Sequence, residues 1–146
     1  MTDSSPAYDA NNIFARILRG ELPCHKVYED DKALVFMDIM PRVDGHALVV
    51  PKAASRNILD ADAADLAHVI AVAQKVARAA MRAFSADGIS ISQFSESAGG
   101  QVLFHTHVHV LPRHHGVDMR PPGVKADDAL LAEHARTLAE AVAAIG

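Results

Sequence analysis

Short apolar or alternating runs recur along the chain, and residues that favour turns bound each of them. Runs rich in β-branched and aromatic residues are typical of β-strands. Asp30-Asp31-Lys32 separates the first two runs, and Gly45 and Pro51 flank the third. The pattern predicts five strands, over residues 26–29, 33–38, 46–50, 89–94 and 102–111.

Residues 60–84 instead repeat apolar side chains at intervals of about 3.6 residues, which predicts a long amphipathic helix. A shorter pattern over residues 13–19, capped by Asn11 or Asn12, predicts an N-terminal helix, and residues 127–145 predict a C-terminal helix. We therefore expect an α+β fold with an antiparallel sheet of about five strands. Residues 11–146 are expected to form one domain, preceded by a flexible tail over residues 1–10.

Composition restricts the possible partners. The chain has 146 residues, half of them apolar, which is enough for the core of one domain. Its net charge of −4 argues against binding to a nucleic-acid backbone. One cysteine, Cys24, fits a reducing compartment, and neither a signal peptide nor a membrane-spanning run is evident. We expect a cytoplasmic protein with no nucleic-acid or membrane partner.

Three histidines occupy alternate positions of the last predicted strand. His105, His107 and His109 should share one face, with Thr106 and Val108 on the other. The pattern has three explanations: structural coincidence, a metal site, or catalysis. Metal binding would normally need further ligands that the spacing of the chain does not supply. Catalysis is favoured, because neutral imidazole is a good nucleophile near pH 7.

The run from His105 to Val110 resembles the His-x-His-x-His-x signature of the histidine triad (HIT) family, in which x is apolar. Gly100-Gln101 before it and Leu111-Pro112-Arg113 after it are also similar to that family, and the resemblance covers residues 12–113. It implies a HIT-like fold. It also implies a purine nucleotide-binding hydrolase or transferase that acts at the α-phosphate, like a nucleoside phosphoramidase.

The resemblance also assigns roles to particular residues. It makes His107 the nucleophile, gives His105 and His109 the phosphoryl oxygens, and adds His46 as a fourth histidine. It makes Asp38 the ribose-binding carboxylate, where a strand-end cap is the alternative. The nucleotide-binding set that it implies is Ile13, Phe14, Ile17, Phe36, Asp38, Ile39, Gly100, Gln101 and Val102. For the three apolar residues of the first helix, simple core packing is an equal alternative.

The resemblance further implies a homodimer, paired through a sheet edge and the long helix near residues 71–80. It implies no cofactor and no metal. Some bacterial members ligate zinc through Cys-x-x-Cys, but Asn12 and Ala15 stand at those positions here. The alternatives to a phosphoramidase are a diadenosine polyphosphate hydrolase and a nucleotide-binding or interaction protein with little turnover.

Two departures from the family pattern bear on substrate preference. Phe94-Ser95-Glu96 stands where many members have Asn-x-Gly, and Val102 stands where many have Ser or Thr. Val102 removes a hydroxyl donor, and Glu96 is expected to place negative charge near the bound anion.

Overall fold

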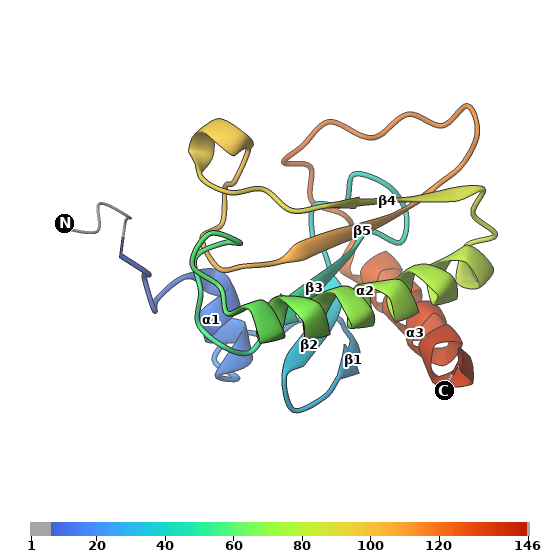
Figure 1. The fold of residues 1–146 in the computed structure, drawn as a ribbon. Helices are drawn as coiled ribbons and strands as arrows, with labels where there is room; N and C mark the ends of the chain where they lie inside the picture. Colours follow the sequence, from blue (N-terminus) through green and yellow to red (C-terminus); the bar gives the residue numbers. More distant parts are fainter. Residues whose placement is uncertain (1–6, 146) are drawn as a thin grey trace.

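The computed structural model describes residues 7–145, which form one five-stranded antiparallel sheet and three α-helices (Figure 1). The elements are α1 (Ile13–Leu18), β1 (Lys26–Glu29), β2 (Ala33–Met37), β3 (Ala47–Pro51), α2 (Ala63–Ala83), β4 (Gly88–Ser92), the 3₁₀ turn η1 (Ser97–Gly99), β5 (Val108–Arg113) and α3 (Asp128–Ile145). The strand order is β1-β2-β3-β5-β4. The predicted α+β class, the strand number and the three helices are confirmed.

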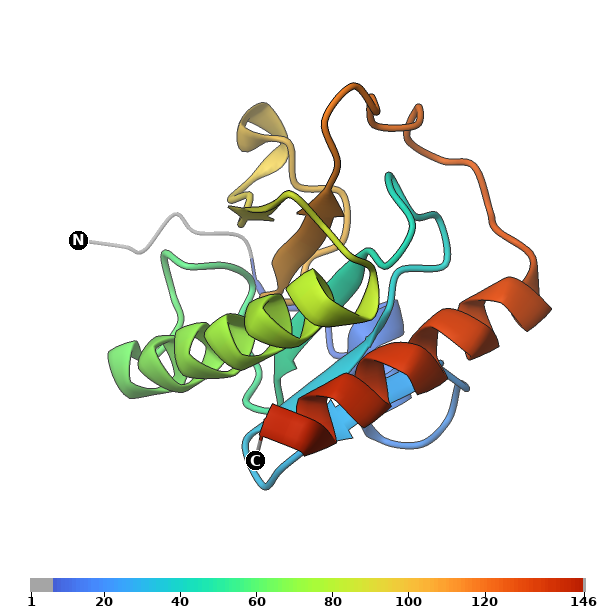
Figure 2. The same cartoon turned by 90° about the vertical axis from the view of Figure 1, so that its right-hand side faces the viewer.

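The two faces of the sheet are covered differently. Helices α2 and α3 lie side by side over one face, and the short α1 lies on the other (Figure 2). Because side chains alternate along a strand, Val35 and Val49 enter the core under α2 and α3, whereas Phe36 and Leu48 pack toward α1. Both faces of β2 and β3 are therefore buried. We call the side that carries α1 the α1 face.

Capping residues fix where the helices begin. The side chain of Asn12 accepts a hydrogen bond from the backbone N–H of Ala15, and that of Asp62 from Ala64. Along α2, Ala73, Ala79 and Ala80 are buried against the sheet of their own chain. These three small side chains therefore serve packing within the chain, and the expected dimer contact near residues 71–80 stays a prediction.

The histidine strand is shorter than predicted. β5 begins only at Val108, because β3 pairs with it through Ala47–Val49 alone. Upstream of Val108 there is no ladder partner, and the chain instead follows the 51–57 loop, where the N–H of Thr106 donates to the carbonyl of Ser55 over 2.9 Å. His105 and His107 therefore lie on irregular backbone. Among residues 7–145, no helix is long and apolar enough to cross a membrane.

Candidate active site

A cavity of about 670 Å³ opens on the α1 face. Its volume is within the range of small-molecule sites. Apolar side chains dominate its wall, and its polar groups include Asp38, His46, His107 and His109. All nine residues expected to bind a nucleotide line it: Ile13, Phe14, Ile17, Phe36, Asp38, Ile39, Gly100, Gln101 and Val102. Sequence reasoning did not identify several others: Leu22, Pro23, Cys24, Met40, Arg42, Leu48, Leu103, Pro122 and Gly123.

His107 presents an unprotonated nitrogen to this cavity. Its Nδ1 lies 2.6 Å from the backbone carbonyl oxygen of His105. A carbonyl only accepts, so Nδ1 carries the hydrogen and Nε2 keeps its lone pair. Burial lowers the pKa of His107 below its ordinary value. The imidazole is therefore neutral at pH 7 and has the tautomer that a nucleophile needs.

His109 has the opposite tautomer, and a hydrogen-bonded chain fixes it. The backbone N–H of Arg42 donates to Nδ1 of His46 over 3.0 Å, so His46 carries its hydrogen on Nε2. That Nε2 lies 2.9 Å from Nδ1 of His109 and donates to it. Since Nδ1 of neutral His109 accepts, its Nε2–H is left as a donor. The ring centroids of His107 and His109 lie 4.9 Å apart, so the ring that keeps a lone pair is next to the ring that keeps a donor.

Burial is the main cause of the low pKa values of His46 and His109. It lowers the pKa of His46, which is 2% exposed, to about 3, and that of His109 to about 4. The positive charges of Arg42 and of protonated His107 lower both pKa values further, and protonated His109 also lowers that of His46. Both imidazoles are neutral at physiological pH.

Asp38 lies at the end of β2, beside this chain of histidines. Its Oδ1 accepts a hydrogen bond of 2.9 Å from the N–H of Met40, and its Oδ2 lies 3.5 Å from Nε2 of His46. The side chain thus caps the local turn and also lines the cavity. Burial raises the pKa of Asp38 above its usual value. Oδ2 is the oxygen that remains available to a ligand hydroxyl.

The metal explanation of the triad does not fit the geometry. Both ring nitrogens of His105 are used within the protein: Nε2 donates to the carbonyl of Pro51 over 2.8 Å, and Nδ1 lies 2.6 Å from the hydroxyl of Tyr8. Asp38, His46 and His109 do place three potential ligand atoms within 4.8 Å of one another. However, Nε2 of His46 and Nδ1 of His109 share a hydrogen bond, and a cation bound by these two atoms would have to displace its hydrogen.

Because both ring nitrogens of His105 have partners within the protein, the geometry favours a positioning role for His105 over the predicted contact with phosphoryl oxygens. His105 is 1% exposed and lies behind the cavity wall. Its backbone carbonyl holds His107, and its ring is held in turn by Pro51 and Tyr8. Tyr8 belongs to the segment expected to be a flexible tail, so no sequence signal indicated its role. Residues 1–6 of that segment lie outside the described residues.

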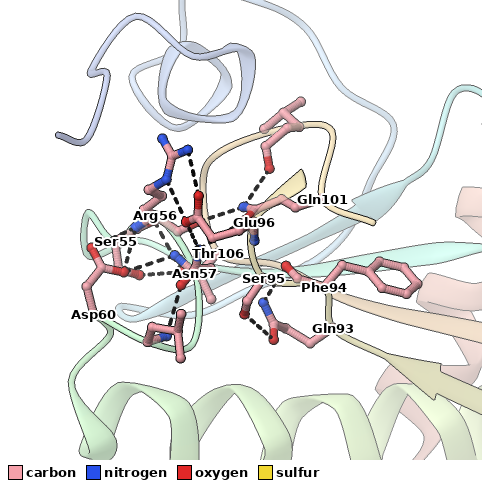
Figure 3. A network of polar contacts seen from close by, with 12 residues as sticks. Ser55, Arg56, Asn57, Asp60, Gln93, Phe94, Ser95, Glu96, Gln101 and Thr106 are labelled. Carbon is pink, nitrogen blue, oxygen red and sulfur yellow. Dashed lines mark hydrogen bonds and ion pairs between the residues drawn. The ribbon is translucent and has the colours of Figure 1, made fainter. Parts of the chain in front are cut away.

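The loop that precedes the triad is held by a dense polar network (Figure 3). The amide of Gln101 donates to the carbonyls of Arg56 and Leu103 and accepts from the N–H of Glu96 and the amide of Asn57. Although Gln101 lines the cavity, its side-chain donors are used within the protein and are not free for a phosphate. Its role is to fix the loop.

Glu96 also differs from expectation. Its carboxylate accepts from Arg56 through two hydrogen bonds, of 2.8 and 3.0 Å, and from Asn57 over 2.6 Å. The Arg56 and Asn57 donors lower the pKa of Glu96, and its charge is directed to this ion pair rather than to the cavity. Its φ of +65° is a conformation that favours glycine, and these hydrogen bonds stabilise it.

Known proteins are similar to this chain in fold and in sequence. The HIT domain family matches residues 19–116. A Hit-like protein involved in cell-cycle regulation from Bartonella henselae, solved with an unknown ligand, superposes with a TM-score of 0.90 at 47% identity, covering 93% of this chain and 99% of that one. A hypothetical histidine triad nucleotide-binding protein from Sulfolobus tokodaii gives a TM-score of 0.84 at 30% identity, with coverage of 90% and 92%. Adenylylsulfatase HINT3 of Arabidopsis thaliana is 35% identical over 101 residues, which are 69% of this chain and 51% of that protein.

Proposed function

The chain belongs to the HIT domain family, and on this basis we propose that it is a nucleotide hydrolase or transferase that acts at the α-phosphate of purine nucleotide derivatives, as a nucleoside phosphoramidase does. The observation that carries the proposal is the pairing of opposite tautomers. The ring of His107, which keeps a lone pair, is next to the ring of His109, which keeps an N–H donor, in one cavity. A nucleophile beside a proton donor is the arrangement that group transfer needs.

The first step forms a nucleotidyl-histidine. Nε2 of His107 attacks phosphorus as the bond from phosphorus to the leaving nitrogen breaks. That nitrogen takes the proton of His109 Nε2 and departs as a neutral amine. The positive charge on nucleotidyl-His107 offsets the negative charge left on His109. Water then attacks phosphorus, returns one proton to His109, and releases the nucleotide with His107 free.

The remaining parts of the cavity support the binding of a nucleoside. Ile13, Phe14 and Ile17 of α1 supply an apolar wall against which a purine base can pack. Asp38, with Oδ2 available, supplies an acceptor for ribose hydroxyls. The backbone N–H groups of Gly99, Gly100 and Gln101 donate to the carbonyls of Glu96 and Ser97 within the loop, so we assign the phosphate oxygens to the two triad histidines that line the cavity. His105 and His46 act indirectly, by holding His107 and His109.

Release of AMP from adenosine 5′-phosphoramidate tests the proposal. We expect turnover by the wild type, and a loss of several orders of magnitude in His107→Ala, because the nucleophile is removed. The matched control is His115→Ala, an exposed histidine outside the cavity. Alkaline quenching of a wild-type reaction should trap a nucleotide on His107, as detected by peptide mass spectrometry. Near-wild-type turnover by His107→Ala would refute the covalent mechanism.

A second candidate substrate is a dinucleoside polyphosphate. The observation that favours it is Arg42, a cation that lines the same cavity near His46 and His109. Comparing AMP release from diadenosine tetraphosphate with that from the phosphoramidate decides between the two substrates.

The third alternative is a binding protein with little turnover, and one argument for it was the negative charge of Glu96 near the bound anion. Glu96 is neutralised by Arg56 and does not oppose a bound anion.

A further inference from the structure

Four rings follow one another along the cavity and give it a direction. The centroids of Phe14 and His107 are 4.9 Å apart, those of His107 and His109 are 4.9 Å apart, and those of His109 and Phe94 are 5.5 Å apart. Phe14 is on α1, with the apolar wall proposed for the base. Phe94 therefore lies beyond the proton donor, at the end where a leaving group departs.

The cavity wall at this end exposes apolar side chains to solvent. Phe94 is 41% exposed and Val102 is 89% exposed, both line the cavity, and Val102 follows by two residues the Gly100 that lies against the Phe94 ring. The ring of Phe94 projects away from the polar network that holds its loop (Figure 3). Apolar surface that is left open beside reactive groups is typical of a binding site for an apolar group.

The loop that carries Phe94 and Val102 is held in place before any ligand arrives. Glu96 is tied to Arg56 and Asn57, and Gln101 uses all of its amide hydrogen-bonding groups within the protein. The Phe94 ring also lies against Gly100, where an added Cβ would be 3.4 Å from it. An apolar surface that is already ordered binds its ligand with little entropic cost.

We propose that Phe94 and Val102 form an apolar leaving-group subsite, so that this enzyme selects nucleotidyl derivatives of amines that carry an aromatic or branched apolar group next to the reacting nitrogen. The inference rests on the proposed function and specifies its substrate class. The covalent steps are those given above, with the apolar amine departing as the neutral species. Arg42 is the competing feature at this cavity, but its Nε already donates to the carbonyl of Arg120.

Two adenosine 5′-phosphoramidates test the subsite, one made from benzylamine and one from 2-methoxyethylamine. The two amines have nearly equal basicity, so the departure of the amine is about equally difficult in both. We expect the wild type to show a kcat/KM about tenfold higher for the benzyl compound, the scale on which pockets discriminate apolar groups. The ratio of the two values is the readout, because a general loss of activity does not change it.

Substitutions of Phe94 and Val102 test whether these two residues cause the preference for the benzyl compound. Phe94→Asn and Val102→Ser should each lower the benzyl to methoxyethyl ratio, and together bring it close to one. Phe94→Leu should retain most of the preference for the benzyl compound. This apolar replacement at the same position separates the loss of apolar surface from misfolding of the Asn variant. The matched control is Ile91→Asn, which replaces a 49% exposed apolar residue of β4 that does not line the cavity. It should keep the wild-type ratio.

A wild-type ratio near one, with AMP still released from unsubstituted phosphoramidate in a His107-dependent way, would overturn the subsite and leave the proposed function intact. A higher kcat/KM for diadenosine tetraphosphate than for the benzyl compound would assign this end of the cavity to Arg42 and also overturn the subsite. Release of AMP from none of these compounds would overturn both proposals.

Discussion

Acidification should destabilise this protein well before its carboxylates titrate. The unfolded chain binds protons at His46 and His109 near pH 6.5, whereas the folded protein binds them only near pH 3 and pH 4. Between these values the unfolded state holds more protons, so stability falls as pH falls. The stabilising contribution is complete above pH 6.5 and is lost progressively toward pH 4.

The magnitude follows from the two shifts. Each pH unit within the window changes the stability by about 1.4 kcal/mol for each histidine. Lowering pH from 7 to 4.5 should therefore remove roughly 5 kcal/mol through His46 and His109 together. Small domains are stable by about 5–15 kcal/mol, so this loss is a large fraction of the total. His105 and His107 act in the same direction, because burial lowers their pKa values as well.

Asp38 acts in the opposite direction. Burial raises its pKa, so the folded protein protonates it before the unfolded chain does. This contribution grows as pH falls from the raised value to the ordinary value of 3.8, and it is fully present below 3.8. It opposes the effect of the histidines at the acid end of the range. Just below pH 6.5 the histidines alone determine the change in stability.

Urea unfolding followed by far-UV circular dichroism, at pH values from 7.5 to 4.5, measures the effect. The midpoint should fall with pH while the denaturant slope stays constant, as expected when stability alone changes. The double variant His46→Gln/His109→Gln should lose much of this pH dependence, and His115→Gln, which changes an exposed histidine, should keep all of it. A stability that is constant from pH 7 to pH 5, or a double variant with the wild-type pH dependence, would refute the reasoning.

Four further predictions follow from the site and the fold. The acid limb of kcat/KM should lie below pH 6.5, because burial lowers the pKa of His107 and only its neutral form attacks; an acid limb above that value in stopped assays would contradict this. Asp38→Asn should weaken AMP binding by about 10- to 100-fold in calorimetry, since charge-assisted hydrogen bonds contribute about 1.5–3 kcal/mol, and the exposed Asp31→Asn should bind AMP as the wild type does. Light scattering at micromolar concentration should give twice the chain mass of 15.6 kDa, and a monomeric mass would refute the dimer inferred from the resemblance. Elemental analysis of untagged protein should find well under one zinc per chain, and a stoichiometric zinc that survives dialysis would make the Asp38, His46 and His109 cluster a metal site.

The sequence alone predicted the fold class and most of the residues that line the cavity. Periodicities of 2.0 and 3.6 residues are local consequences of backbone geometry, so they place strands and helices directly. They located all five strands and three helices, and the spacing of the triad, with the family resemblance, pointed to His107, His109, His46 and Asp38.

Only the tertiary structure decided what each of these side chains does. The alternation of the triad predicted three histidines on one face of a strand, but β5 begins after His107 because its neighbour β3 pairs no further along it. His105 therefore turns to Pro51 and Tyr8, and its carbonyl sets the tautomer of His107. Tautomers depend on hydrogen-bond partners that are distant in sequence, and no local pattern encodes them.

The same reason explains the loop that precedes the triad. From the sequence, Glu96 was a negative charge near the expected phosphate, and Phe94 was a departure from the family pattern that bears on substrate preference. The fold pairs Glu96 with Arg56, 40 residues away, and places Phe94 against His109. Long-range partners determine whether a charge is neutralised and which way a ring points, because they are brought together only when the sheet and its loops assemble.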